Sequence, residues 1–295
     1  PLSWVLVSDF QKNQLYCGES VEAWPDRFVE GAWSGDFESA LFSNAENLFG
    51  SGAVIGDGRA DVFPPTHTLE AVYLLHVGEC WFVSNSLALL MARSGARLRY
   101  RYPRTILQFI GIMEGLEHAH QQAETSKGTL HIVRYRAVTI TPDGISLHDR
   151  STPSQFKDFS VYRKYLSASL NQVAANARHR QRRQRYSLLA TISSGYDSAA
   201  CAALAAETGC TQALTFATSL DGEPDDGCDI GDHLKLEVMM ASHPGNTVFR
   251  KEPSELADFF ATGMHGDDIN SLVFEPNLKH TILVTGFHGD KVWDK

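Results

Sequence analysis

The chain has 295 residues, of which 43% are hydrophobic and 21% charged, and its net charge is −9 at pH 7. That length accommodates two domains with separate cores, and the acidic balance argues against a protein that holds nucleic acid through phosphate contacts. No apolar run approaches the roughly 20 residues that cross a bilayer, and no basic-then-apolar leader opens the sequence, so we expect a cytoplasmic protein with no membrane partner.

The five cysteines are scattered and never spaced as C-x-x-C. This pattern predicts neither a zinc knuckle nor a disulfide framework. We expect reduced, mostly buried thiols at Cys17, Cys80, Cys201, Cys210 and Cys228.

The first half of the chain is rich in β-branched and aromatic residues between turn formers, which predicts strands at 2–10, 51–58, 80–85 and 130–141. Ser86 and Gly95 bound a predicted short helix as its N-cap and its stop. The glycine-rich "GSGAVIGDG" lacks the Lys-Ser/Thr of a Walker loop, so it predicts a hairpin. Together these elements favour an α+β sandwich over a parallel sheet.

After a polar linker at 148–160, the second half alternates helix and strand. Helical spacing at 161–180 predicts a long helix that leads into this region. The alternation predicts a parallel sheet, and ligands bind such sheets at the carboxyl ends of the strands. The expected strands are 187–192, 213–217, 247–249 and 281–286, and the expected helices are 198–207 and 230–240.

One basic stretch, "ARHRQRRQR" at 177–185, departs from the acidic balance. We interpret it as the last turn of the long helix, where cations suit the negative end of the dipole. Contact with RNA or another anion is the alternative.

The turn at 193–198 lies between a buried strand and an alanine-rich helix. The first amides of a helix favour an anion, and Gly195 lets the backbone approach a bulky ligand. The hydroxyls of Ser193, Ser194 and Ser198 suit phosphate oxygens, and Asp197 suits a divalent cation that accompanies the phosphates. The alternative is that these side chains only cap the helix.

The sequence of this turn differs at one position from the G-x-S-x-G elbow of serine hydrolases, because Thr191 stands in place of the first glycine. A hydrolase would use Ser193 with a downstream histidine, of which His265, His280 and His288 are candidates. No arrangement of these residues favours that hypothesis.

Two motifs resemble known enzymes. "SSGYDS" at 193–198 resembles the S-G-G-x-D-S loop of the ATP pyrophosphatase (PP-loop) families, with Ser194 replacing the second glycine. "LVTGFHGDKVWDK" at 283–295 is similar to a later motif of asparagine synthetases, in which Gly286, Asp290 and Trp293 match. His288 and Lys291 stand where that family has a glycine and a glutamate.

The resemblance implies an ATP and Mg²⁺ site. Asp197 and Asp290 would hold the metal and, with Lys291, act in catalysis. The segment 214–217 would lie along the adenine, with Leu214, Phe216 and Ala217 as the named contacts. Glu223, Asp225 and Asp226 are candidate metal or substrate carboxylates, or a solvated acidic loop. Ser193, Gly195 and Ser198 would surround the pyrophosphate, and Ser194, Tyr196, Gly286 and His288 are further expected ATP-binding residues.

The first half loosely resembles the glutaminase-like (Ntn) domain of asparagine synthetases, through "GAWSGDF", "FGSGAVIGDG" and "CWFVSNSLALLMA". That family uses an N-terminal cysteine whose own amine is the base, but this chain opens Pro1-Leu2-Ser3. Either a cysteine precedes Pro1, or the domain has lost this activity, as in β-lactam synthetases and lasso-peptide cyclases.

We therefore expect an α/β protein with two domains. An α+β Ntn-like sandwich at 1–150 precedes a parallel-sheet PP-loop ATP pyrophosphatase domain at 158–295. Whether this second domain is truncated at its C-terminus is left open. The expected activity is an ATP-dependent, AMP-forming ligase that adenylates a small-molecule or peptide carboxylate for attack by an amine. An inactive ATP- or partner-binding homologue is the main alternative, and a serine hydrolase is the weaker one. A homodimer is left open.

Overall fold

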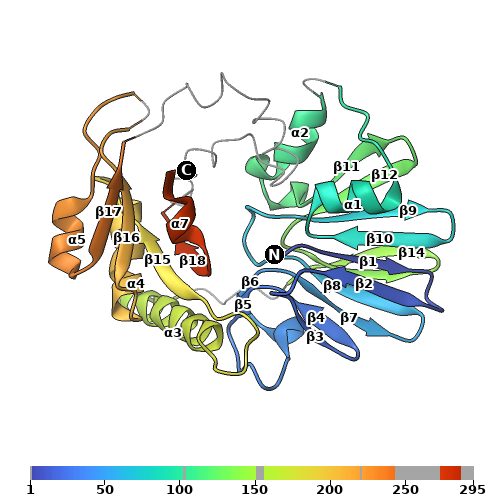
Figure 1. Ribbon diagram of the computed structural model, residues 1–295, viewed down its shortest axis with the longest axis horizontal. Helices are drawn as coiled ribbons and strands as arrows, with labels where there is room; N and C mark the ends of the chain where they lie inside the picture. Colours follow the sequence, from blue (N-terminus) through green and yellow to red (C-terminus); the bar gives the residue numbers. More distant parts are fainter. Residues whose placement is uncertain (1, 102–103, 151–155, 220, 243–272, 287–295) are drawn as a thin grey trace. The chain divides into compact units, whose positions relative to one another are not determined.

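The computed structural model describes residues 2–101, 104–150, 156–219, 221–242 and 273–286. These residues divide into two compact units, the first comprising 2–101 and 104–150 and the second comprising 156–219, 221–242 and 273–286 (Figure 1). Among the described residues, no helix combines the length and the apolar character needed to cross a membrane.

The first unit contains two six-stranded antiparallel sheets. The first sheet has the order β11-β12-β9-β10-β1-β2, and the second has the order β14-β13-β8-β7-β4-β3. The strands of the first sheet are β1 (Trp4–Ser8), β2 (Asn13–Cys17), β9 (Val72–Val77), β10 (Cys80–Ser84), β11 (His120–Thr125) and β12 (Gly128–Val133). Those of the second are β3 (Glu22–Trp24), β4 (Arg27–Val29), β7 (Gly52–Gly56), β8 (Arg59–Phe63), β13 (Ala137–Thr141) and β14 (Gly144–His148). A small third sheet pairs β5 (Ala32–Trp33) with β6 (Leu48–Phe49).

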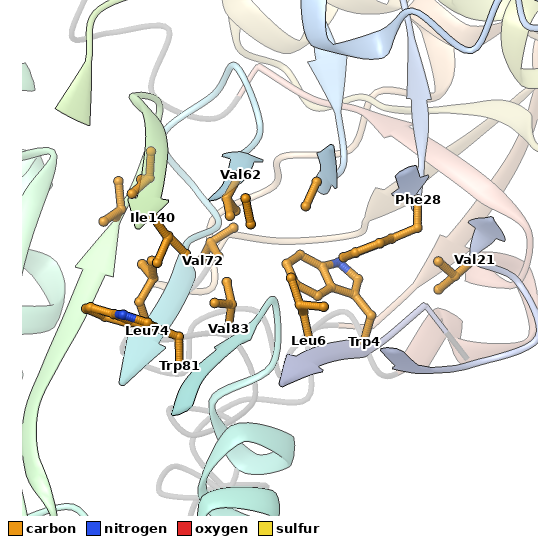
Figure 2. Packing of buried hydrophobic residues seen from close by; sticks show 14 residues of the cluster. Trp4, Leu6, Val21, Phe28, Val62, Val72, Leu74, Trp81, Val83 and Ile140 are labelled. Carbon is orange, nitrogen blue, oxygen red and sulfur yellow. The ribbon is translucent and has the colours of Figure 1, made fainter. Parts of the chain in front are cut away.

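The core of the first unit lies between these two sheets (Figure 2). Alternate residues of its strands point into it, as the period of a β-strand requires, so Trp4 and Leu6 of β1 face Phe28 of β4. The rings of Trp4 and Phe28 meet edge to face with centroids 4.8 Å apart. Burial of such large apolar side chains is the main force that holds the sheets together.

Helices cover the other face of the first sheet. Leu87 and Leu90 of α1 (Leu87–Ser94) and Phe109 of α2 (Arg104–Ile110) pack on Tyr73 and Leu75 of β9. The predicted start and stop of α1 are confirmed, because Ser86 Oγ accepts from the Leu89 amide and Gly95 is left-handed at φ 63°. Short 3₁₀ turns lie at η1 (Phe42–Asn44), η2 (Gly111–Glu114) and η3 (Leu116–His118).

The single strand expected at 130–141 is two strands in different sheets. β12 belongs to the first sheet and β13 to the second, and the chain passes between them at Arg134 and Tyr135. Tyr135 has φ 62°, a left-handed conformation that ends the extended run. The expectation of mostly buried cysteines is also wrong, because only Cys210 is buried, whereas Cys17 is exposed and the other three are intermediate.

Glu30 lies buried in the first unit, among polar groups at the start of β1. Its Oε1 accepts hydrogen bonds from the Ser51 amide at 2.8 Å and the Ser51 hydroxyl at 3.0 Å. Ser51 Oγ in turn accepts from Trp4 Nε1 at 3.1 Å, and the Trp4 amide donates to Asn85. Burial, together with the charge of Glu70, raises the pKa of Glu30 to about 8, so the carboxyl is mostly protonated at neutral pH.

Two histidine rings stack on the β11–β12 hairpin. The centroids of His120 and His131 are 5.2 Å apart, and His120 Nε2 lies 3.0 Å from His131 Nδ1. Burial, with a further contribution from His120, lowers the pKa of His131 to about 4. Both rings are therefore neutral at pH 7.

The second unit contains the parallel sheet that the alternation predicts, with the order β17-β16-β15-β18. The chain moves to one side of β15 to form β16 and β17 and returns on the other side as β18, so the strand order reverses beside β15. The strands are β15 (Ser187–Thr191), β16 (Gln212–Phe216), β17 (Glu237–Ala241) and β18 (Thr281–Val284). The helices are α3 (Phe159–Ala177), α4 (Tyr196–Glu207), α5 (Cys228–Leu234) and α7 (Glu275–Leu278).

The helix expected at 230–240 is wrong over its second half. α5 ends at Leu234 because Lys235 is left-handed at φ 59°, and β17 follows in register with β16 from Glu237 opposite Gln212. Sheet pairing here overrides helical spacing. α4 begins at Tyr196, earlier than expected, and the strand expected at 247–249 lies outside the described residues.

The expectation that the basic stretch is the last turn of the long helix is wrong, because α3 ends at Ala177 and has no basic residue in its last turn. Part of the stretch has another structural role. The Arg178 guanidinium donates to the carbonyl of Thr208 at 3.2 Å and to that of Gly209 at 3.1 Å, so it neutralises the carboxyl end of α4 rather than of its own helix. Arg182 is buried and donates to Asn176 Oδ1 at 2.8 Å. These contacts account for Arg178 and Arg182 without an RNA partner.

Candidate functional site

A cavity of about 620 Å³ lies at the carboxyl ends of β15, β16 and β18, where the strand order reverses. This is the position at which open parallel sheets bind ligands, and the volume is that of a small-molecule site. The lining residues are Thr191, Ile192, Ser193, Gly195, Asp197, Ser198, Leu214, Thr215, Phe216, Thr218, Ser219, Asp221, Asp225, Phe274, Leu278, Leu283, Thr285 and Gly286.

The loop between β15 and α4 is held by a closed set of hydrogen bonds. The Gly195 amide donates to Ser193 Oγ at 3.2 Å, and the Ser193 amide donates to Ser198 Oγ at 3.1 Å. The two hydroxyls lie 2.9 Å apart, and Ser198 Oγ donates to the Gly195 carbonyl at 3.0 Å. Because the Ser198 hydroxyl proton is already donated to the Gly195 carbonyl, the Ser193 hydroxyl is the donor in the hydrogen bond between the two serines. The loop conformation is therefore set before any ligand enters.

The amino end of α4 faces the cavity without a side-chain cap. Gly195 is the N-cap residue and offers no side chain to the first-turn amides of Tyr196, Asp197 and Ser198. A Cβ at Gly195 would lie 3.3 Å from Ser193 Oγ, closer than an ordinary contact, so glycine keeps the loop compact. An uncapped amino end with a hydroxyl beside it is suited to bind an anionic oxygen.

Gly286, just after β18, lies directly against the amino end of α4. A Cβ there would lie 2.6 Å from the Asp197 backbone carbon and 2.9 Å from the Asp197 Cβ, and it would collide with the Ser198 nitrogen. Two segments that are about ninety residues apart in the chain thus meet at backbone distance. Asp197 and the start of the later motif are therefore brought together at the carboxyl ends of the strands.

The acidic loop after β16 is a small hairpin that is attached to the serine loop. Thr218 and Pro224 form its bridge, and the Asp225 amide donates to the Ala217 carbonyl at 3.3 Å. Asp225 Oδ1 accepts from the Ser194 amide at 3.1 Å and from the Ser194 hydroxyl at 2.6 Å. A carboxylate oxygen therefore already occupies donors of the serine loop.

The other side of the cavity is apolar. Leu214 and Phe216 at the end of β16 pack with Phe274, which precedes α7, and the rings of Phe216 and Phe274 are 5.2 Å apart. Leu278 and Leu283 complete this wall. Such a wall offers apolar and aromatic surface on the side of the cavity away from the polar serine loop.

The predicted site residues fall into three groups. Those that line the cavity are Ser193, Gly195, Asp197, Ser198, Leu214, Phe216 and Gly286. Three do not line it: Ser194 contacts Asp225, Tyr196 is 94% exposed, and Ala217 belongs to the hairpin. His288, Asp290 and Lys291 lie outside the described residues.

Sequence reasoning missed Phe274 and Leu278 in the cavity wall. No motif marks these positions, and only the topology brings them to the edge. Thr215 is buried, and its hydroxyl accepts from the Gly227 amide at 3.0 Å, which anchors the end of the acidic hairpin.

The described residues offer Ser193 no histidine. His280 precedes β18, and its carbonyl accepts from the Ser187 amide at the amino ends of the strands, whereas Ser193 lies at their carboxyl ends. His265 and His288 lie outside the described residues. The Ser193 hydroxyl is engaged with Ser198, an arrangement that suits positioning rather than nucleophilic attack.

The donor set fits Mg²⁺ held mainly by phosphate. Asp197 lines the cavity at the uncapped end of α4, and Asp221 and Asp225 line it from the hairpin. Within the described part of the chain, no three His, Cys, Asp or Glu side chains converge as a metal site. Mg²⁺ commonly takes one or two carboxylates, with substrate phosphates and water as its other ligands, so Asp197 alone would satisfy the protein's share of such a site.

Ionisation near the site follows local burial and hydrogen bonding. Burial, with the Asp197 charge as a second cause, raises the pKa of the Cys201 thiol one turn along α4 and keeps it protonated. The Cys228 amide donates to Asp226 Oδ1 at 3.1 Å and lowers the pKa of that exposed carboxyl.

No protein-family model matches the chain, and a search of curated proteins finds no match.

Proposed function

We propose that the second unit binds ATP with Mg²⁺ in this cavity and activates a substrate carboxylate as its acyl-adenylate. The observation that carries this proposal is the contact of Gly286 with the backbone of Asp197 and Ser198. It brings the serine loop, which resembles that of the PP-loop families, together with the start of the motif that resembles asparagine synthetases, at the reversal point of a parallel sheet.

The phosphates would lie at the amino end of α4. The free amides of its first turn and the hydroxyls of Ser193 and Ser198 are donors for phosphate oxygens. The contact of Asp225 with Ser194 supports this placement, since the loop already donates two hydrogen bonds to an anionic oxygen. The adenine would pack between Leu214, Phe216 and Phe274.

The reaction is a substitution at the α-phosphorus. A carboxylate oxygen of the substrate attacks the α-phosphorus, the bond to the bridging oxygen breaks, and pyrophosphate leaves with that electron pair. An amine nitrogen then attacks the acyl carbon, and AMP leaves with a proton released from the nitrogen. Asp197 would hold Mg²⁺, which offsets the charge of the departing pyrophosphate, and the serine loop would keep that group in place.

The first unit supports the same family at the level of architecture. Two facing antiparallel sheets with β1 inside the first sheet, and helices on the outer face, are compatible with a glutaminase-like (Ntn) sandwich. This assignment of the first unit is part of the proposal. It predicts no glutaminase chemistry from the residues that the structure describes.

Calorimetric titration with ATP and Mg²⁺, followed by a pyrophosphate-release screen over carboxylates, tests the proposal. Asp197→Asn should weaken Mg²⁺-dependent binding by about tenfold or more and abolish release. The matched control is Asp229→Asn, an exposed carboxylate on α5 outside the cavity, which should change neither. Binding without release by the unaltered chain would favour an inactive homologue, and no binding would refute the nucleotide site.

A further inference from the structure

The segment Arg97–Arg101 forms the outer edge of the first sheet. Leu98 bridges Thr125 of β11, the Arg99 amide donates to the Glu124 carbonyl at 2.9 Å, and the Arg97 carbonyl accepts from the Ser126 amide at 2.8 Å. β11 is the last strand of the sheet in this direction, so the segment extends the sheet beyond it.

The backbone of this segment has a second row of hydrogen-bonding groups that points away from β11. In an antiparallel pair the groups of alternate residues face the partner, so those of Leu98 and Tyr100 face outward when those of Arg97 and Arg99 face β11. Within the described residues, the outward groups have no hydrogen-bond partner. Such a row is a template for another strand.

Arginine side chains follow this edge at alternate positions. Arg97, Arg99 and Arg101 are exposed, and in an extended chain such alternate residues are about 6.7 Å apart. Arg99 and Arg101 share one small hollow with Arg104 at the start of α2. Glu124 lies 3.7 Å from Arg101, and no described carboxylate pairs with Arg97, Arg99 or Arg104. Four guanidinium groups with one ion pair among them make this edge locally positive, although the net charge of the chain is −9.

We propose that this edge docks an acidic peptide segment, which adds to the first sheet as an extended strand beside Leu98–Tyr100. The peptide backbone would bond the outward groups, and acidic side chains at alternate positions would meet the arginines. Nucleic acid offers phosphates to the arginines but no backbone amides or carbonyls at strand spacing, so the free edge favours a peptide. Tyr100, which is 44% exposed, adds an aromatic surface beside the row. The proposal does not rest on the nucleotide site.

The probe is a labelled peptide of about seven residues, blocked at both ends, in which glutamate alternates with valine. Its binding to the full chain is followed by fluorescence anisotropy. We expect saturable binding below about 1 mM that weakens several-fold from about 50 to about 300 mM NaCl. A peptide of the same composition with its glutamates in one block should bind about tenfold more weakly, because its carboxylates miss the spacing.

Two matched sets of variants separate docking from general charge. Arg97→Gln with Arg99→Gln should weaken binding about tenfold, since each exposed ion pair contributes modestly. Arg180→Gln with Arg185→Gln makes the same charge change in the second unit and should leave binding within about twofold. An unchanged thermal transition of the first pair excludes unfolding as the cause, and Asp197→Asn should bind the peptide normally.

N-methylation of the peptide tests the added strand directly. Methyl groups on one alternate set of amides should abolish binding, whereas those on the other set should be tolerated, because only one set faces the edge. Equal effects of both sets, or equal binding of the alternating and block peptides, would overturn the proposal. Tighter binding of a short single-stranded RNA, lost in the Arg97 and Arg99 variant, would also overturn it in favour of a nucleic-acid surface.

Discussion

Replacement of Gly286 by alanine tests whether the segment after β18 is built against α4. The added Cβ would lie 2.6 Å from the Asp197 backbone carbon, whereas ordinary contacts begin near 3.4 Å. The two backbones would have to separate by roughly 0.8 Å, and no flexible side-chain tip can absorb that shift. Overpacking of this kind costs about 1–3 kcal/mol, which lowers the melting temperature by on the order of 2–12 °C for a domain of this size.

The displacement falls on the amino end of α4, so Gly286→Ala should also weaken ATP binding by at least about tenfold. Differential scanning calorimetry and titration calorimetry on the full chain measure the two effects. Gly56→Ala is the matched control, because its Cβ would meet only the Arg59 side chain, with Cγ nearest at 3.7 Å, and its backbone does not require glycine. A Gly286→Ala protein that melts and binds ATP like the Gly56→Ala protein would refute the packing of these two segments.

Three further predictions concern charge and pH. Asp225→Asn should strengthen the binding of ATP without Mg²⁺ by about threefold, since it removes a negative charge of the cavity lining that would repel the phosphates. Weaker binding in titration calorimetry would contradict this reasoning. Burial raises the pKa of Glu30 to about 8, so between about pH 4.5 and about 8 the folded state holds a proton that the unfolded state has lost. The free energy of unfolding should therefore decline as pH rises through this range. Glu30→Gln should remove on the order of 2 kcal/mol of this decline, as measured by urea unfolding. Burial lowers the pKa of His131 to about 4, so stability should fall as pH drops from about 6.5 to about 4; His131→Gln should flatten this slope by about 1 kcal/mol, discounted for partial exposure, and an unchanged acid limb would count against the burial of that ring.

The serine loop and its two flanking elements were predictable because their determinants are local. A short apolar run, a glycine at the turn and an alanine-rich run define β15, Gly195 and α4 without reference to the rest of the chain. The same holds for α1, whose cap and stop are single residues on either side of it.

Other features depend on contacts that no local pattern records. β17 follows a helical spacing in the sequence, and it becomes a strand because β16 offers an edge in register. Arg134 and Tyr135 interrupt what looks like one continuous strand, and the two halves join different sheets. Phe274 reaches the cavity only through the return of the chain to β18. Tertiary pairing decided each of these cases.

The position of β1 has a consequence for biosynthesis. β1 lies between β2 and β10, and Val5 pairs with Ser84. At ribosomal rates, the residues between β1 and β10 take roughly 4–15 seconds to emerge. A nascent chain can close the β1–β2 hairpin early, but one flank of β1 stays open throughout that interval. Folding yield in cells should therefore depend on translation speed and chaperone supply more than on the strength of the finished core.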